Sequence, residues 1–167
     1  KRQAALQQCR RFLSYLPGSV YERTPRYEPS DDRERMEEEL LTAVPRDSNV
    51  AFDMREVIEM IVDLDSFFEM GRDYGPSQIA GFARLDGQPV GVLANDCVHY
   101  AGAMTAEAAQ KYRRFVEMCD MFHVPIINFI DQPGFMIGPE AERKGTIRYG
   151  MSAVAAAAQA TIPWASI

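Results

Sequence analysis

The sequence predicts an α/β domain in which a mainly parallel sheet is covered by helices. The first observation is the run 126–130, which is almost entirely β-branched or aromatic and suits a strand buried on both faces. The second is a helix on either side of that run, predicted by the spacing of apolar residues over 105–122 and by the richness in alanine over 145–160. The third is a further strand-like run at 163–167. Because parallel strands need a crossover connection, this order of strands and helices favours a parallel arrangement.

Composition limits the classes of protein to which the chain can belong. The chain has 167 residues, 47% of them hydrophobic, which is enough for one core. Its net charge is −6 and basic residues are interspersed with acidic ones, so we expect no nucleic-acid partner. The three cysteines, Cys9, Cys97 and Cys119, lie far apart, which argues against a disulfide framework and a metal site. No apolar run approaches the ~20 residues of a membrane span, so we expect a protein of a reducing compartment without a membrane partner.

The first 49 residues are expected to form a helix followed by a polar linker. Apolar residues recur at three- and four-residue spacing over 4–16, which predicts an amphipathic helix ending at Pro17 and Gly18. Residues 19–49 are polar and rich in proline, which is typical of a linker with little core of its own. We therefore divide the chain into 1–49 and a compact domain, 50–167. Because residue 1 is not methionine and 163–167 lacks a terminating turn, we interpret both ends as cuts.

The compact domain opens with a capped helix. Asp53 is expected to cap a helix over 54–62, and Glu56 stands three residues later, as in a capping box. A brief strand is predicted at 66–70.

A hairpin and two helices complete the predicted elements. Strands at 78–85 and 89–94 flank Asp86-Gly87, a turn that requires positive φ. Thr105 is expected to cap the helix that leads to the central strand. The second helix, 145–160, is rich in alanine, which lets it lie close to a neighbour.

Several side chains allow two interpretations. The turn from Asp131 to Gly138 is either a ligand-binding loop at the end of a strand or a tight connection. Asp131 itself suits a cap of the following turn better than an acid or base. Arg148 could contact an anion, or pair with Asp131 or Glu142. The segment 100–102 could border a pocket or form a plain turn.

The remaining candidates favour structural roles. We expect the three cysteines to be buried small apolar residues. His99 and His123 have no partner at ligand spacing, and we expect both to be structural.

Six phrases in the chain together resemble one family. They are 11–17 (RFLSYLP), 44–47 (VPRD), 53–58 (DMREVI), 67–69 (FFE), 81–85 (GFARL, with Gly87) and 131–135 (DQPGF). In their order and spacing they resemble the carboxyltransferase (β) subunits of biotin-dependent acyl-CoA carboxylases, of which propionyl-CoA carboxylase is a member. The resemblance covers essentially the whole chain.

The resemblance implies a crotonase-like fold, a β-β-α spiral present as two repeats in one subunit. The N-terminal repeat binds acyl-CoA and the C-terminal repeat binds carboxybiotin. This chain resembles the interdomain linker (1–49) followed by the first part of the C-terminal repeat (50–167). The implied partners are a biotin carboxyl carrier domain, a biotin carboxylase subunit and further copies in a hexameric ring, in a bacterial cytoplasm or a mitochondrial matrix.

The implied reaction moves a carboxyl group from carboxybiotin to the α-carbon of an acyl-CoA. A biotin-dependent decarboxylase subunit, or a non-catalytic assembly module, stays open as an alternative. Biotin is implied on a separate carrier domain, acyl-CoA is the implied substrate, and no metal is expected.

Such chemistry needs fixed backbone N–H donors more than catalytic side chains. The biotin-side pocket is therefore expected to be lined by Pro133, Gly134, Phe135, Gly138 and Gly145. Arg148 is expected as an anion contact.

No catalytic residue is expected in this chain. The family's glycine-rich oxyanion loop follows the strand that begins here at Trp164, beyond the residues at hand. The charged stretch 140–144 also departs from the family pattern, which leaves the acyl chain open.

Overall fold

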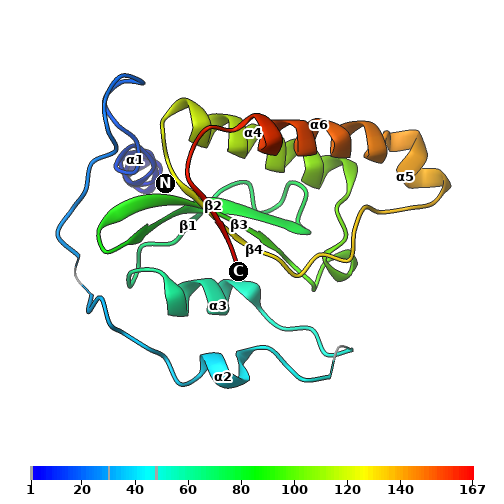
Figure 1. The fold of residues 1–167 in the computed structure, drawn as a ribbon, viewed down its shortest axis with the longest axis horizontal. Coiled ribbons are helices and arrows are strands. Elements are labelled where there is room, and N and C mark those ends of the chain that lie inside the picture. The colour runs from blue at the N-terminus through cyan, green and yellow to red at the C-terminus, as the bar shows by residue number, and fades with distance from the viewer. Residues whose placement is uncertain (1, 30, 48) are drawn as a thin grey trace.

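The computed structural model describes residues 2–29, 31–47 and 49–167, which fold around one five-stranded sheet. The strands keep their chain order across the sheet (Figure 1). They are β1 (Phe68–Glu69), β2 (Gln78–Leu85), β3 (Gln88–Asn95), β4 (Ile126–Phe129) and β5 (Trp164–Ser166). Neighbours are antiparallel from β1 to β3 and parallel from β3 to β5. The predicted α/β class, with one hairpin entering a parallel sheet, is confirmed.

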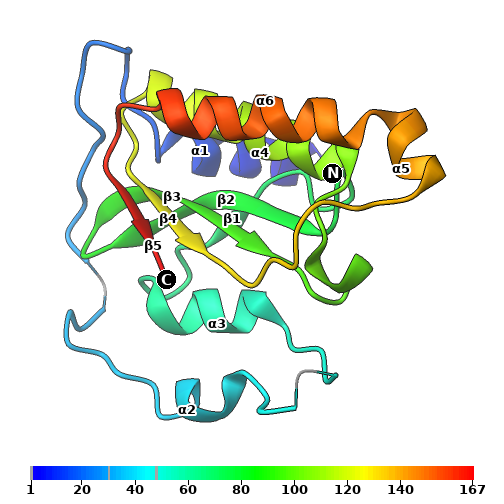
Figure 2. The same ribbon diagram turned by 45° about the vertical axis from the view of Figure 1, so that its right-hand side comes forward.

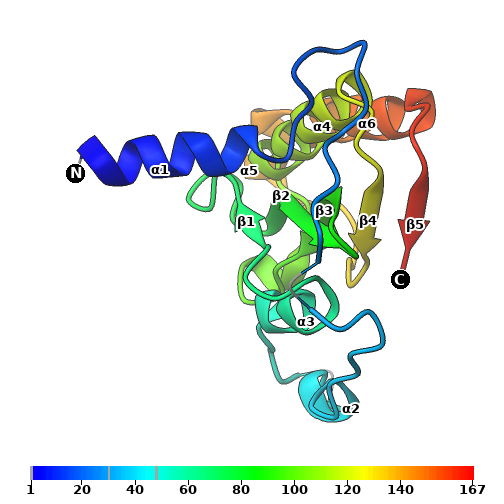
Figure 3. The same cartoon turned by 90° about the vertical axis from the view of Figure 1, so that its left-hand side faces the viewer.

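Helices cover both faces of the sheet. Helices α4 (Ala106–Met121) and α6 (Thr146–Gln159) lie side by side on one face, and α1 (Arg2–Leu13) lies on the same side (Figure 2). Helix α3 (Met54–Ile61) covers the opposite face, with the short α2 (Leu40–Ala43) outside it. Figure 3 shows that α1 projects beyond the β1 edge, whereas β5 forms the opposite edge. Since α4 connects the parallel strands β3 and β4, the predicted crossover is confirmed.

The central strands bury side chains on both faces. On the α3 side, Ile79 and Ala83 of β2 pack with Val92 of β3. On the α4 side, Phe82 and Leu93 belong to a second cluster that includes residues of α4. This two-sided burial explains the nearly continuous apolar runs of β2, β3 and β4.

Side chains of helix α4 pack directly on Gly91 of β3. A Cβ atom at Gly91 would lie 2.7 Å from the Cys119 sulfur and 3.1 Å from Phe115 Cε1. The helix can therefore take this position only because residue 91 has no side chain. The same burial raises the pKa of the Cys119 thiol above its ordinary value.

Both predicted helix caps are formed. Asp53 Oδ1 accepts the Arg55 N–H at 2.9 Å, and Thr105 Oγ1 accepts the Ala108 N–H at 3.1 Å. The capping box at α3 is incomplete, because within residues 49–167 Glu56 makes no hydrogen bond back to Asp53.

The polar segment between α1 and α3 runs along the domain. Tyr27 N–H donates to Gly87 O at 3.1 Å, and a Cβ atom at Gly87 would lie only 1.8 Å from Tyr27 O. Farther on, Arg35 donates to Val62 O at 2.6 Å and pairs with Asp31 at 2.8 Å. The segment is thus fixed to the hairpin turn and to the end of α3.

The structure differs from the sequence prediction mainly in short elements. The strand predicted at 66–70 is reduced to two residues, β1. Helices α2 and α5 (Pro139–Lys144) have four and six residues, too few for an amphipathic period to reveal them. The charged stretch 140–144 therefore belongs to a helix, and its acidic first turn and basic last turn complement the helix dipole.

Candidate functional site

Two loops lie together where the parallel strands β3 and β4 end. Met104, after β3, donates its N–H to Gly134 O and accepts the Met136 N–H, both at 2.9 Å. The loop after β4 is thereby pinned on both sides of Phe135. The N–H groups of Gly134 and Phe135 make no hydrogen bond within the part of the chain that the structure describes. They are left available to a ligand.

The loop after β3 is backbone-strained. Tyr100, Ala101 and Gly102 follow one another with φ values of 54°, 50° and 78° in the turn η1 (Tyr100–Gly102). Only glycine adopts this left-handed region without cost, and strain of this kind concentrates at functional sites. A Cβ atom at Gly102 would lie 3.0 Å from Asp131 O, so the two loops touch here as well. This contact favours the view that 100–102 borders a site.

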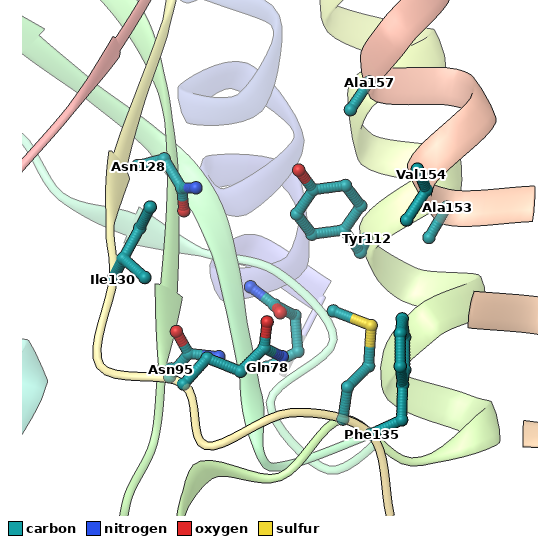
Figure 4. Close-up of a pocket in the computed structure, with 11 residues that line it drawn as sticks. Gln78, Asn95, Tyr112, Asn128, Ile130, Phe135, Ala153, Val154 and Ala157 are labelled. Atoms are coloured by element: carbon teal, nitrogen blue, oxygen red, sulfur yellow. The ribbon is translucent and has the colours of Figure 1, made fainter. Parts of the chain in front are cut away.

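A cavity of about 200 Å³ lies between the sheet and helices α4 and α6, beside these loops (Figure 4). Polar residues from the three central strands and the β4 loop line one side, and apolar residues from α6 and the loops line the other. The lining residues are Gln78, Asn95, Met104, Tyr112, Asn128, Ile130, Gln132, Phe135, Ala153, Val154 and Ala157. None of them carries a charged side chain.

The amides in this cavity keep free hydrogen-bonding groups. Gln78 is 2% exposed and donates from Nε2 to Ile79 O at 2.9 Å and Ala94 O at 2.8 Å. Its Oε1 has no partner among the described residues. Asn95 accepts the Asp131 N–H at 3.3 Å through Oδ1. Its NH₂ group donates to none of the described residues. The cavity thus offers acceptors and donors together, without charge.

Tyr112 of α4 adds a hydroxyl group to the cavity. Figure 4 shows its ring between the sheet amides and α6. Burial raises the pKa of Tyr112, so the hydroxyl keeps its proton at neutral pH and can donate as well as accept.

The structure brings only part of the predicted lining to this cavity. Phe135 lines it, whereas Pro133, Gly134, Gly138 and Gly145 do not. Pro133 and Gly134 belong to the same pinned loop as Phe135. Gly138, with φ 112°, precedes α5.

One detail of the predicted site is borne out and one is corrected. Gly145 lies, as expected, at the start of the alanine-rich helix: it is the N-cap residue of α6, which begins at Thr146, and it also ends α5 in the left-handed conformation, with φ 75°. The prediction of Asp131 as a cap is wrong, because its exposed carboxylate accepts no hydrogen bond from any described residue.

Arg148 is exposed on the first turns of α6. Its guanidinium stacks on the Tyr149 ring, 4.8 Å from the centroid, and donates to the Tyr149 hydroxyl at 3.1 Å. The alternative pairing with Asp131 or Glu142 is absent from the ion pairs of the described residues. The guanidinium keeps donors for an anion.

The amides were missed because they lie within or beside buried strands, where apolar periodicity dominates. A signal exists in retrospect. Asn128 interrupts an apolar run, and Gln78 and Asn95 are register partners at adjacent ends of β2 and β3. Polar residues at strand ends on the same face of a sheet converge on one place.

A buried cluster of charged side chains lies near this site. It was not predicted from the sequence. Arg55 bonds both oxygens of Glu69, at 2.8 and 2.7 Å, and Asp96 at 2.6 Å. Lys111 of α4 donates to Gln78 O at 2.6 Å, next to the cavity. These contacts tie α3 to β1 and to the end of β3, and they tie α4 to β2.

The three cysteines differ in burial, and His123 lies at the end of a helix. Cys119 is buried as predicted and Cys97 is half-buried, but the prediction for Cys9 is wrong: it is exposed, because α1 buries none of its residues. His123 ends α4 and contacts Val20 O at 3.1 Å, in accord with a structural role.

Within residues 2–29, 31–47 and 49–167, no group of His, Cys, Asp or Glu side chains is arranged to hold a metal ion. Over the same residues, no helix is both long and apolar enough to cross a membrane.

Comparisons with known proteins agree with this architecture. The family model described as carboxyl transferase domain matches residues 1–167. The propionyl-CoA carboxylase carboxyltransferase subunit of Haloferax mediterranei is 41% identical over 159 residues, which cover 95% of this chain and 31% of that protein. The methylmalonyl-CoA decarboxylase subunit alpha of Veillonella parvula is 39% identical over 156 residues, with coverages of 93% and 31%.

A solved structure extends the comparison to three dimensions. Transcarboxylase 12S, described as a hexamer assembly with methylmalonyl-coenzyme A bound, superposes with a TM-score of 0.93 at 33% identity. The match covers 98% of this chain and 32% of that one. The chain thus spans about a third of the length of these relatives. The predicted crotonase-like class is confirmed by this likeness.

Proposed function

The chain belongs to the carboxyl transferase domain family, and we propose that it forms part of an enzyme that moves a carboxyl group from carboxybiotin to the α-carbon of an acyl-CoA. One observation carries the proposal beyond family membership. An uncharged cavity with free amide donors and acceptors lies at the carboxyl ends of parallel strands, where α/β folds bind ligands. Its wall includes Phe135 of the pinned loop.

The cavity suits the ureido ring of biotin better than it suits acyl-CoA. A volume of about 200 Å³ admits one small ring system and not a nucleotide-bearing thioester. A ureido group presents N–H donors and a carbonyl acceptor, which match the free groups of Gln78, Asn95 and Asn128. Because no charged side chain lines the cavity, a neutral ring enters without leaving a charge unpaired.

Carboxybiotin supplies the carboxyl group, and negative charge develops on the ureido oxygen as that group leaves. In our proposal the loop residues Pro133, Gly134 and Phe135, with Gly138 and Gly145 at the ends of α5, form the biotin side of the active site. The N–H groups of Gly134 and Phe135 are fixed before the reaction, which is what an oxyanion donor requires. Arg148, whose guanidinium forms no ion pair among the described residues, is the proposed contact for an anion such as the transferred carboxylate.

The partners follow from the same chemistry. A biotin on a separate carrier domain must reach the loop, and a biotin carboxylase must recharge it. A homo-oligomer, hexameric in the intact enzyme, is proposed because the similar transcarboxylase 12S forms a hexamer assembly. Relatives from bacteria and from pig mitochondria support a bacterial cytoplasm or a mitochondrial matrix as the compartment.

A second function is favoured by one comparison. The relative from Veillonella parvula is a methylmalonyl-CoA decarboxylase subunit, and a decarboxylase uses the transfer in the opposite direction. The cavity serves either direction, since the same ureido ring is bound before or after transfer. A non-catalytic assembly module is the outcome if neither direction is observed.

The test measures carboxyl transfer by the full-length protein, between free biotin and methylmalonyl-CoA or malonyl-CoA, in both directions. Asn128→Asp puts a charge into the cavity with almost no change of shape, and we expect a loss of about tenfold or more in transfer. Gln159→Glu makes the same chemical change at the exposed end of α6 and serves as the control. No transfer by the unaltered protein would refute the function. An active Asn128→Asp protein would refute the cavity as the ureido site.

A further inference from the structure

Helix α6 contains a glycine in its interior, where glycine lowers the stability of a helix. Gly150 lies in the middle of Thr146–Gln159, a segment otherwise rich in alanine, the residue with the highest helix propensity. The glycine conformation gives no reason for its presence, because its φ lies outside the left-handed region. Glycine here weakens the helix, so a reason has to be sought in what it contacts.

That contact is the aromatic ring of the pinned loop. A Cβ atom at Gly150 would lie 2.4 Å from Phe135 Cε1, 2.9 Å from Cδ1 and 3.0 Å from Cζ. Separations below 3.0 Å do not occur between a real Cβ and a carbon atom, so the ring is seated directly on the helix backbone. Gly150 therefore forms a notch that only a residue without a side chain can provide.

The ring is held by packing on one side and borders the cavity on the other. Phe135 packs against a small cluster that contains Met104, Ala108 and Ala153, from the β3 loop, α4 and α6. The backbone on both sides of the ring is bonded to Met104 through Gly134 O and the Met136 N–H. A group that pushes the ring out of the notch therefore strains the loop that carries it.

We infer that Gly150 is a positioning residue: its notch seats Phe135 and so fixes the backbone of Gly134 and Phe135 for carboxyl transfer. The inference rests on the function proposed above for this loop. It adds a residue that lies outside the cavity lining and outside every predicted site. It also gives α6 a second task, since the helix holds the β4 loop in place besides covering the sheet.

The test uses four variants of the full-length protein. Gly150→Ala adds the methyl group that meets the ring. Phe135→Leu withdraws the ring tip from the notch without adding an atom to the helix. The third variant combines both changes. Ala155→Gly, at an exposed position of the same helix, alters helix propensity without contact to the loop and is the matched control.

The first readout is independent of activity. Hydrogen exchange of the Met104 and Met136 amides reports whether the loop stays bonded to its neighbour. We expect Gly150→Ala and Phe135→Leu each to speed this exchange about tenfold or more, which corresponds to loosening of the two backbone bonds. Ala155→Gly should leave both amides at the parental rate. Unchanged exchange in both loop variants would overturn the inference.

The second readout is transfer. A displacement of the loop by about 1 Å is expected to lower kcat for transfer by roughly ten- to a hundredfold in Gly150→Ala, with little change in KM for the acyl-CoA. The double variant should be more active than the product of the two single effects predicts, because the shorter leucine side chain introduced by Phe135→Leu no longer meets the added methyl group as closely as the ring does.

If the fold-losses in transfer of the two single variants multiply in the double variant, the two residues act independently, and the inference is overturned. An unaltered protein without transfer activity would refute the proposed function instead, while the exchange rates would still decide whether the notch holds the loop.

Discussion

Arg55 and Glu69 are joined side-on, with guanidinium Nε and Nη2 donating to the two carboxylate oxygens at 2.8 and 2.7 Å. The remaining arm of the guanidinium donates to Asp96 at 2.6 Å. Glu69, which gives the largest contribution, raises the pKa of Arg55 above its ordinary value. Because the side chains of Arg55 and Asp96 are 14% and 3% exposed, water replaces none of these contacts easily.

Removing the guanidinium should therefore be costly. Arg55→Met leaves Asp96 without its ion pair and Glu69 with only the exposed Arg72 at 3.8 Å, and we expect a loss of about 3 kcal/mol in the free energy of unfolding. Denaturant titration of both proteins measures it. Arg113→Met is the control, since its pair with Glu117 is about half exposed and is worth less than about 1 kcal/mol. Equal losses at the two sites would show that the Arg55 cluster adds no stability of its own.

The cap of α3 gives a smaller and more local prediction. Asp53→Ala removes the acceptor for the Arg55 N–H and should cost about 1 kcal/mol of stability without impairing transfer. Glu56→Ala should cost less, because the reciprocal bond of a capping box is not formed at this helix within the described residues. Denaturation midpoints of the two variants decide the matter. A larger effect at Glu56 would show that the box closes in solution.

The buried amine of Lys111 predicts a pH dependence of stability. Burial lowers the pKa of Lys111 from 10.5 to about 8 in the folded protein. Between these two values the unfolded chain holds more protons than the folded one, so this residue makes the free energy of unfolding rise with pH. Well below a pH of about 8 both states hold the proton and the contribution is constant.

The substitution Lys111→Met isolates the contribution of this residue to the pH dependence of stability. Buried Cys119 acts in the opposite direction above its ordinary pKa of 9, since its folded-state pKa is raised. The stability of Lys111→Met is therefore compared with that of the parent at each pH from about 7 to about 10, a range that spans the lowered pKa. The free energy of unfolding of Lys111→Met minus that of the parent should fall as pH rises above about 8. A difference that does not vary with pH would mean that Lys111 titrates normally.

Gly134 supplies a prediction on chemistry. Its φ of 131° is strained for any other residue, although no atom lies within 4 Å of a Cβ atom placed there. Gly134→Val should strongly reduce transfer and leave the sheet intact, because a branched side chain then fills the space beside the loop N–H groups. Gly71→Val also places a valine at a positive φ, 59°, in the exposed loop after β1, and it controls for a branched residue at a positive φ away from the site. Transfer and thermal stability are measured together, and an active Gly134→Val protein would identify the loop as a mere connection.

The long elements of the fold were predictable because local signals agree with the tertiary structure. Thr105 and Asp53 cap their helices as expected, and the Asp86-Gly87 turn has the positive φ values, 50° and 74°, that its sequence requires. The short helix α5 escaped because six residues do not complete a recognisable period.

The candidate site was only partly predictable. The loop at Phe135 could be located from a strand followed by Pro133 and Gly134. The amides of Gln78 and Asn95 were missed because each lies at the end of an apolar strand, although the register set by the Asp86-Gly87 turn makes them partners. Gly150 looked like an unexceptional member of a small-residue helix, since its notch exists only when a ring from a distant loop is seated in it.

The close approach of α4 to Gly91 has a practical consequence for anyone who follows this protein in solution. Cys119 is sealed beneath the helix and its thiol is held protonated, whereas Cys9 is open to solvent. A thiol reagent will therefore modify Cys9 first, half-buried Cys97 after it, and Cys119 only in molecules whose helix has lifted from the sheet. The slowest phase of labelling reports how often α4 lifts from the sheet, through a cysteine that the chain already contains.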